Sequence, residues 1–253
     1  MVDSADVPSP RDRDLGPVAA LFGDPARTAM LAALAGGQAL PAGELARRAG
    51  VHPSTASAHL RRLIDGGLVR VRAQGRHRYH ELSGPQVAAV LEALAQLAPP
   101  APVTTLRQHQ SAAILNEART CYDHLAGRCG VELRDRLLAS GALVAADDRD
   151  HVLTARGRDL LAALDLDPSR LERSRRLFAR SCIDWTHRRP HLAGALAAAV
   201  TERFLTLGWL TRAGDRGLRM HSEYGRYLDE WLAGSPASDG RADNAGARDR
   251  VSR

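Results

Sequence analysis

Residues 53–82 read PSTASAHLRRLIDGGLVRVRAQGRHRYHEL, and the spacing of their apolar residues changes halfway along. The first half carries leucine and isoleucine at helical spacing, and the glycine pair at 66–67 predicts the end of that helix. Apolar and basic residues then nearly alternate over 68–74, and a second short run at 77–82 follows a glycine. Two such runs joined by a glycine-containing turn are typical of a β-hairpin. The stretch therefore predicts a helix at 53–65 followed by a two-stranded hairpin.

The helix at 53–65 is preceded by another short helix. Residues 41–48 are predicted to be helical, and a tight turn at 49–52 joins the two helices. This arrangement is typical of a helix-turn-helix, in which the second helix enters the major groove of DNA. Further helices are predicted over 25–35 and 85–97, so the hairpin would form the wing of a winged helix-turn-helix.

The helix at 53–65 has one apolar and one polar face, as a helix that reads a groove requires. Leu60, Leu63 and Ile64 point toward a core, whereas small hydroxyl residues at the helix start allow close approach to bases. Basic side chains farther along can reach phosphates, and the arginine-rich hairpin suits phosphates or the minor groove. The predicted DNA contacts are Ser54, Thr55, Ser57, His59, Arg61, Arg62, Arg76, His77 and Arg78.

Positive charge is concentrated in the same segment. The whole 253-residue chain has a formal net charge of +6. Between residues 52 and 82, six arginines against Asp65 and Glu81 leave +4 in 31 residues. An anionic partner is therefore expected here, and the helix-turn-helix pattern favours double-stranded DNA.

Residues 15–97 resemble the ArsR/SmtB family of winged-helix repressors. The resemblance rests on LFGDPAR at 21–27, ELA at 44–46, STASAHLRRL at 54–63, GLV at 67–69 and the GRHRY wing at 75–79. It implies a homodimer built from the first and last helices, binding to an imperfect inverted repeat, and repression that an effector relieves. Metal ligands of the family's sensors do not carry over, because residues 41–49 contain no cysteine and 85–97 offers only Glu92.

The second half of the chain contains an internal duplication. His-Leu-Ala-Gly occurs at 124–127 and again at 191–194, and further matches continue at that offset. Each copy is expected to resemble the back half of a winged helix, and two copies could pack about a pseudo-twofold axis. We therefore predict a mainly α (α+β) protein, with a winged helix-turn-helix followed by a helical domain of two winged-helix-like repeats. The predicted boundaries are 1–14 disordered, 15–97 DNA-binding domain, 98–103 linker, 104–233 duplicated sensor and dimerisation domain, and 234–253 disordered tail.

Cysteine, aspartate and histidine recur just ahead of each repeat. The candidate effector or thiol site comprises Cys121, Asp123, His124, Cys182, Asp184 and His191. Three interpretations remain open: buried core cysteines with aspartate helix caps, a small-molecule or thiol-redox site, or a metal site. The metal, any cofactor and the effector stay unassigned, and the two histidines are expected to make structural hydrogen bonds.

The predicted function is that of a sequence-specific transcriptional regulator, a dimeric repressor released by an effector sensed in the C-terminal domain. The alternatives are an effector-free architectural DNA binder and an enzyme with a DNA-targeting module. The sequence has no Gly-rich phosphate loop, nucleophile elbow or H-E-x-x-H motif, so no enzyme is predicted. The sequence contains no apolar signal-peptide core and no membrane span, and its three cysteines are too few for a disulfide scaffold. The protein is therefore expected to be cytoplasmic, with no membrane partner.

Overall fold

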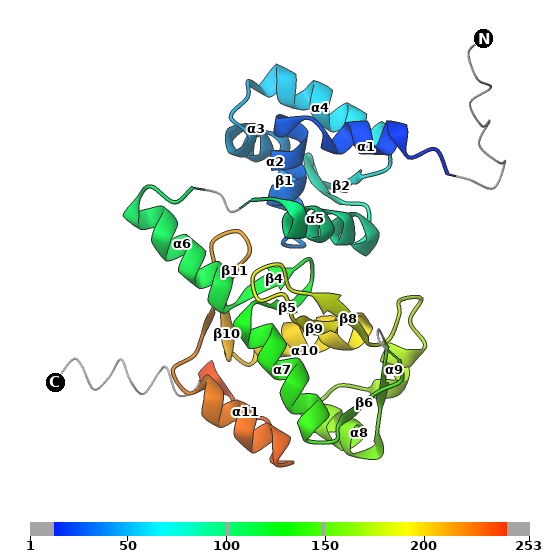
Figure 1. Cartoon of the computed structure of the whole chain (residues 1–253), viewed down its shortest axis with the longest axis vertical. Coiled ribbons are helices and arrows are strands. Elements are labelled where there is room, and N and C mark those ends of the chain that lie inside the picture. Colours follow the sequence, from blue (N-terminus) through cyan, green and yellow to red (C-terminus); the bar gives the residue numbers. More distant parts are fainter. Residues whose placement is uncertain (1–12, 100–101, 148–149, 242–253) are drawn as a thin grey trace, which may run out of the picture. The chain divides into compact units, whose positions relative to one another are not determined.

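The computed structural model describes residues 13–99, 102–147 and 150–241. The chain divides into two compact units, of which the first holds residues up to 34 and 38–87 (Figure 1). The second holds residues 35–37 and the chain from 88 onward. In the described residues, no helix combines the length and apolarity that crossing a bilayer requires.

The first unit has the element order of a winged helix-turn-helix. Its elements are α1 (Gly16–Phe22), α2 (Pro25–Leu34), β1 (Leu40–Pro41), α3 (Ala42–Ala49), α4 (Pro53–Asp65), β2 (Val69–Gln74), β3 (His77–Leu82) and the start of α5 (Pro85–Leu97). The predicted helices at 53–65 and 85–97 are confirmed, as is the hairpin between them. The observed sheet has the antiparallel order β1-β3-β2.

The turn between α3 and α4 follows from its residues. Gly50 adopts the left-handed conformation at φ 65°, which ends α3 and redirects the chain. Pro53 fits the first position of α4, and the His52 ring accepts a hydrogen bond from the Ser54 N–H at 3.4 Å. The two helices therefore remain in contact with only a short turn between them.

The core of the first unit lies between α2, α3, α4 and the hairpin. Its largest fully buried side chains are Met30, Leu31, Leu34, Leu45, Leu63 and Leu82. Arg27 is buried as well, and its guanidinium donates hydrogen bonds to the carbonyls of Leu21 and Ala20 at the end of α1. This arginine fixes α1 against α2.

The second unit repeats one order of elements. After α6 (Leu106–Glu117), the first half contains β4 (Arg119–Cys121), β5 (His124–Ala126), α7 (Arg128–Ala139), β6 (Leu143–Ala145), β7 (His151–Leu153) and α8 (Ala155–Ala162). After α9 (Pro168–Glu172), the second half contains β8 (Arg180–Ile183), β9 (Pro190–Ala193), α10 (Ala195–Thr206), β10 (Leu210–Ala213), β11 (Gly217–Met220) and α11 (Tyr224–Leu232). Each half thus runs hairpin, helix, hairpin, helix.

The two halves pack across each other. Helix α7 of the first half contacts β9 of the second, and α10 of the second half contacts β5 of the first. The strands β5 and β9 also touch, and β4 and β5 join β10 and β11 in one four-stranded sheet. Each half therefore covers apolar surface of the other.

An aromatic group fills the interior beside α10 and α11. Phe204 lies 4.7 Å from Trp209 and 5.7 Å from Trp231 between ring centroids. The indole of Trp209 donates a hydrogen bond to the Ser238 carbonyl at 2.7 Å. Residues 234–241, assigned from sequence to a disordered tail, thus pack on this core because they satisfy a buried indole N–H. The rest of that predicted tail, and residues 1–12 of the predicted disordered N-terminus, lie outside the described residues.

Candidate functional site

The start of α4 presents hydroxyl groups to solvent. Ser54, Thr55 and Ser57 are exposed, while Ala56 and Leu60 of the same helix are buried. The Ser57 hydroxyl donates to the Pro53 carbonyl at 2.9 Å and keeps its acceptor lone pairs free for another donor. The helix therefore has the two faces that the sequence predicts.

The basic residues of α4 divide into two groups. Arg61 and Arg62 are exposed. His59 instead lies against the start of α2, with its Nδ1 3.7 Å from the Asp24 carboxylate and its side chain only 15% exposed. Of the basic side chains on α4, the two arginines are thus the more accessible to a phosphate.

The tip of the β2–β3 hairpin carries Arg76, His77 and Arg78, all exposed. Nearer its base, Glu81 accepts a hydrogen bond from Arg70 at 2.8 Å, and a guanidinium nitrogen of Arg72 lies 3.9 Å from the same carboxylate. Within the described residues, Arg76 and Arg78 form no ion pair. The tip therefore keeps its positive charge available to an external anion.

A second group of chemically reactive side chains lies in the second unit, where strand register places each cysteine opposite a histidine. Cys121 pairs with His124 across β4 and β5, and Cys182 pairs with His191 across β8 and β9. Because β5 and β9 touch, the two hairpins bring these four side chains together. We call Cys121, His124, Cys182 and His191 the Cys–His cluster.

The Cys–His cluster is tight and mostly buried. Its four ligand-type atoms lie within 4.8 Å of one another, and the two Sγ atoms are 3.9 Å apart. The imidazoles stack with ring centroids 5.2 Å apart, and of the histidine hydrogen bonds expected from the sequence, His124 makes one, between its Nδ1 and Asp123 Oδ1 at 3.3 Å. Both nitrogens of His191 and Nε2 of His124 are buried without a hydrogen-bond partner in the described structure.

The electrostatics of the cluster favour one thiolate. The Cys121 thiol can donate a hydrogen bond to the sulfur of Cys182, and with the nearby imidazoles this holds the pKa of Cys182 well below its usual range. The same hydrogen bond, together with burial, raises the pKa of Cys121. Burial opposes a charge on His124, but Asp123 and Cys182 raise its pKa overall.

An aspartate accompanies each histidine of the cluster. Asp123 Oδ1 lies 3.3 Å from Nδ1 of His124, and Asp184 Oδ2 lies 3.8 Å from Nδ1 of His191. Burial would raise the pKa of Asp184, but the charge of Arg119 lowers it, so this carboxylate is ionised. All six residues of the predicted effector site thus lie in or beside one cluster.

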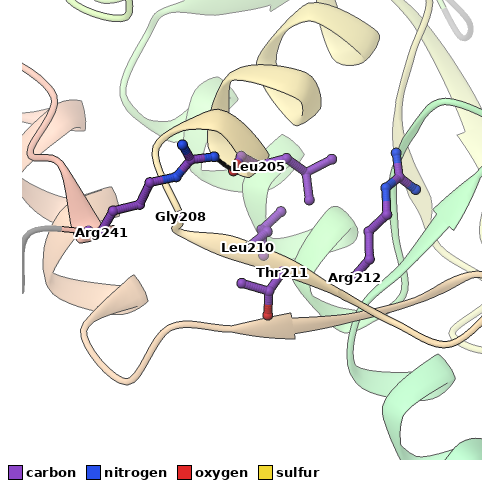
Figure 2. A pocket seen from close by; sticks show the side chains of 7 residues that line it. Leu205, Gly208, Leu210, Thr211, Arg212 and Arg241 are labelled. Carbon is purple, nitrogen blue, oxygen red and sulfur yellow. Dashed lines mark hydrogen bonds between the residues drawn. The ribbon is translucent and has the colours of Figure 1, made fainter. Parts of the chain in front are cut away.

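A shallow pocket of 330 Å³ lies elsewhere in the second unit (Figure 2). It is lined by Leu205, Gly208, Leu210, Thr211, Arg212, Gly240 and Arg241. The Arg241 guanidinium extends to the Leu205 carbonyl at 3.5 Å. The lining holds none of the residues predicted from the sequence to form a site.

Comparisons with known proteins agree with the geometry of the first unit. The family described as "Helix-turn-helix domain" matches residues 22–72. An uncharacterized HTH-type transcriptional regulator of Bacillus subtilis, YdfF, is 39% identical over 199 residues, which are 79% of this chain and 88% of the relative. The chain belongs to the helix-turn-helix transcriptional regulators. The resemblance to ArsR/SmtB proteins is confirmed for the N-terminal part of the regulator.

Solved structures match a shorter part of the regulator. HlyU from Vibrio cholerae is 30% identical and covers 32% of the regulator and 87% of its own chain, with a TM-score of 0.30. The homodimeric winged helix-turn-helix domain of Mb0332 from Mycobacterium bovis, a possible ArsR-family regulator, is 31% identical. It covers 33% of the regulator and 75% of its own chain, with a TM-score of 0.30.

Sequence reasoning missed Arg119, the buried partner of Asp184 at 2.8 Å, whose guanidinium also lies 4.5 Å from the Trp185 ring centroid. A signal for it exists, because Arg-Thr-Cys-Tyr-Asp at 119–123 recurs as Arg-Ser-Cys-Ile-Asp at 180–184. The regulator therefore repeats, together with each cysteine and aspartate, the arginine that precedes them.

Proposed function

We propose that the regulator is a homodimeric transcriptional repressor that binds an imperfect inverted repeat in double-stranded DNA through residues 15–97. The observation that carries this proposal is the unpaired, exposed arginine tip of the hairpin beside a helix whose starting residues are small, polar and exposed. Because such a repressor acts on DNA, we place it in the cytoplasm. The proposal includes no catalytic activity.

Each element has its own role in this proposal. Ser54, Thr55 and Ser57 contact base edges, since their hydroxyls both donate and accept hydrogen bonds. Arg61 and Arg62 contact phosphates beside the major groove. The wing residues Arg76, His77 and Arg78 contact phosphates or the neighbouring minor groove. His59, turned toward Asp24, acts by orienting the helix in this scheme.

Dimerisation is supported by exposed apolar side chains on α1 and α5. Leu15, just before α1, is 72% exposed, and Leu97, at the end of α5, is 84% exposed. Val18 on α1 and Val90 and Leu94 on α5 are also exposed. Exposed apolar side chains are costly in water, and a second copy of the chain would cover those of each helix.

We further propose that residues 104–233, within the second unit, sense the effector. The two halves of this unit share one order of elements and would be winged-helix-like repeats around the Cys–His cluster. A buried cluster that favours a thiolate suits an effector that is thiol-reactive, a metal or a small molecule. Operator affinity that changes with such agents in the wild type, and not in Cys121→Ser or Cys182→Ser, would support this role.

The DNA-binding proposal is tested with purified full-length protein and DNA from upstream of its own gene. We expect a footprint over an inverted repeat, a dimer by light scattering, and an affinity that falls steeply as salt rises. Absence of protection, or salt-independent binding, would overturn the DNA-binding role. A folded monomer that still protects the site would overturn the dimer alone.

A further inference from the structure

We propose that Cys121, His124, Cys182 and His191 bind a single Zn²⁺ ion in a tetrahedral site of two sulfurs and two nitrogens. Each half of the second unit supplies one cysteine and one histidine, from strands that face each other within a hairpin. The ion would therefore join the two halves. This inference concerns metal binding alone and stands whether or not the protein binds DNA.

The separation of the sulfur atoms fits a shared metal ion. With Zn–S bonds of about 2.3 Å, two sulfurs in a tetrahedral site lie about 3.8 Å apart. The Sγ atoms of Cys121 and Cys182 are 3.9 Å apart, and all four ligand-type atoms lie within 4.8 Å of one another. The sulfur atoms of Cys121 and Cys182, which are 61 positions apart in the sequence, thus have nearly the separation of two sulfurs bound to one zinc ion.

Buried ring nitrogens without partners point independently to a ligand. His191 is 0% exposed, and neither of its ring nitrogens has a hydrogen-bond partner in the described structure. Nε2 of His124 has none either. Burying polar atoms without partners costs free energy, and coordination of a metal ion would remove that cost.

The two aspartates are placed to support metal-bound histidines. A histidine that binds a metal through one ring nitrogen usually donates from the other nitrogen to a carboxylate. Here Asp123 lies beside Nδ1 of His124 and Asp184 beside Nδ1 of His191. That arrangement leaves Nε2 of each ring for the metal.

The ligand set selects the class of ion. Two thiolates and two imidazoles in a tetrahedral arrangement favour Zn²⁺ over Mg²⁺ or Ca²⁺, which prefer oxygen. Two thiolates also neutralise a divalent ion, so the occupied site adds no net charge to a buried region. Four protein ligands close the coordination shell, as in sites where zinc stabilises a fold.

A disulfide between Cys121 and Cys182 is the main rival interpretation. A sulfur separation of 3.9 Å is compatible with later oxidation, but a disulfide would leave Nε2 of His124 and both ring nitrogens of His191 without a partner in the described structure. Zinc binding uses all four side chains. The histidines therefore decide between the two interpretations.

The test uses full-length protein, reduced and freed of metal, titrated with Co²⁺ as a spectroscopic probe and then with Zn²⁺. We expect one equivalent of Co²⁺ to give the intense ligand-field bands of a tetrahedral site and thiolate-to-cobalt charge transfer, and Zn²⁺ to displace it. Cys121→Ser and Cys182→Ser should each weaken binding at least tenfold. Cys129→Ala, which removes the third cysteine, should bind as the wild type does.

Circular dichroism of every sample distinguishes a variant that has lost metal binding from one that has lost its fold. The titration of the wild type tests the proposal even if a variant does not fold. The proposal fails if folded wild-type protein binds no Co²⁺, or if Cys121→Ser binds Co²⁺ with the affinity and spectrum of the wild type. It also fails if anaerobically purified protein contains a Cys121–Cys182 disulfide and takes up no metal after reduction. DNA binding is measured on the same samples, and its outcome tests the proposed function without bearing on the zinc site.

Discussion

Arg119 and Asp184 form an ion pair that is almost completely shielded from water, with Nη2 and Oδ2 2.8 Å apart and side chains 1% and 0% exposed. The same carboxylate accepts hydrogen bonds from the backbone N–H groups of Gly127 at 2.7 Å and Thr186 at 2.9 Å. Asp184 thereby connects the β4–β5 hairpin and the start of α7 to the loop after β8.

Replacing Asp184 with asparagine should destabilise the second unit strongly. The guanidinium of Arg119 would remain buried without a counter-charge, a change that typically costs about 3–5 kcal/mol. Urea unfolding followed by circular dichroism measures the loss. As a control, Asp165→Asn removes the exposed partner of Arg203, where the carboxylate side chain is 80% exposed, and should change stability by less than about 1 kcal/mol. Equal effects of the two substitutions would contradict the structural role of the buried pair.

The winged domain could be predicted in detail because its signals are local. The glycines at 66–67 and 75 mark the end of α4 and the hairpin turn, and the apolar period changes between them. Each element of residues 53–82 is therefore encoded by neighbours in the sequence, and the structure differs from the expectation by only one residue at the start of β2.

The Cys–His cluster could be predicted only in part, because its geometry depends on distant pairing. The loop between β8 and β9 is longer than that between β4 and β5, so the cysteines and the histidines repeat at different offsets. Burial of Arg119 was not predictable, since an arginine in a strand ordinarily faces solvent and its partner is 65 positions away. Sequence thus indicates the residue types but not their register.

The double substitution Arg76→Ala/Arg78→Ala should weaken binding to every DNA sequence. Each lost phosphate contact reduces the slope of log affinity against log salt by about 0.9, so the slope should fall by nearly 2. Fluorescence anisotropy over a salt series measures both quantities. Arg173→Ala/Arg175→Ala removes the same charge from exposed positions in the second unit and should leave the slope unchanged. Unaltered operator affinity in the wing variant would refute the role of the wing.

Ser57→Ala should change which operator is preferred, with little effect on non-specific affinity. Ser57 is exposed whereas Ala56 and Leu60 are buried, so loss of its hydroxyl would remove a base contact while leaving the helix packing intact. We expect a cost of about 1–3 kcal/mol at the operator and relaxed preference at one base pair. Binding to a library of operator variants measures this, with random DNA as the internal control. A uniform loss across all sequences would indicate a phosphate contact instead.

The first unit should lose stability in mild acid through His80. Burial lowers the pKa of this histidine and the charge of Arg78 lowers it further, although a hydrogen bond with the Leu40 backbone opposes the shift. Above about pH 6.5 the ring is neutral in both the folded and the unfolded chain, so its contribution is fully present. Below that pH the unfolded chain takes up the proton first, and stability falls as the pH approaches the lower, folded pKa.

Unfolding of the wild type and His80→Gln at pH 7, 6 and 5 tests this expectation. The difference between the two proteins isolates His80 from other histidines, and the variant should lose less stability in acid. His77→Gln removes an exposed histidine from the same strand and should keep the wild-type dependence. An identical loss in wild type and His80→Gln would show that other groups control the acid response.

Gly194→Ala should be poorly tolerated, because both backbone conformation and space require glycine there. Gly194 is the N-cap of α10 and has φ 98°, and a Cβ there would lie 2.7 Å from the carbonyl oxygens of Leu177 and Phe178. A residue forced into this conformation costs about 1–3 kcal/mol before the clash is counted. Gly225→Ala, at a helical position in α11 where a Cβ meets nothing within 4 Å, should be neutral or stabilising. If thermal unfolding shows the two variants to be equally stable, the tight junction between β9 and α10 does not constrain the second unit.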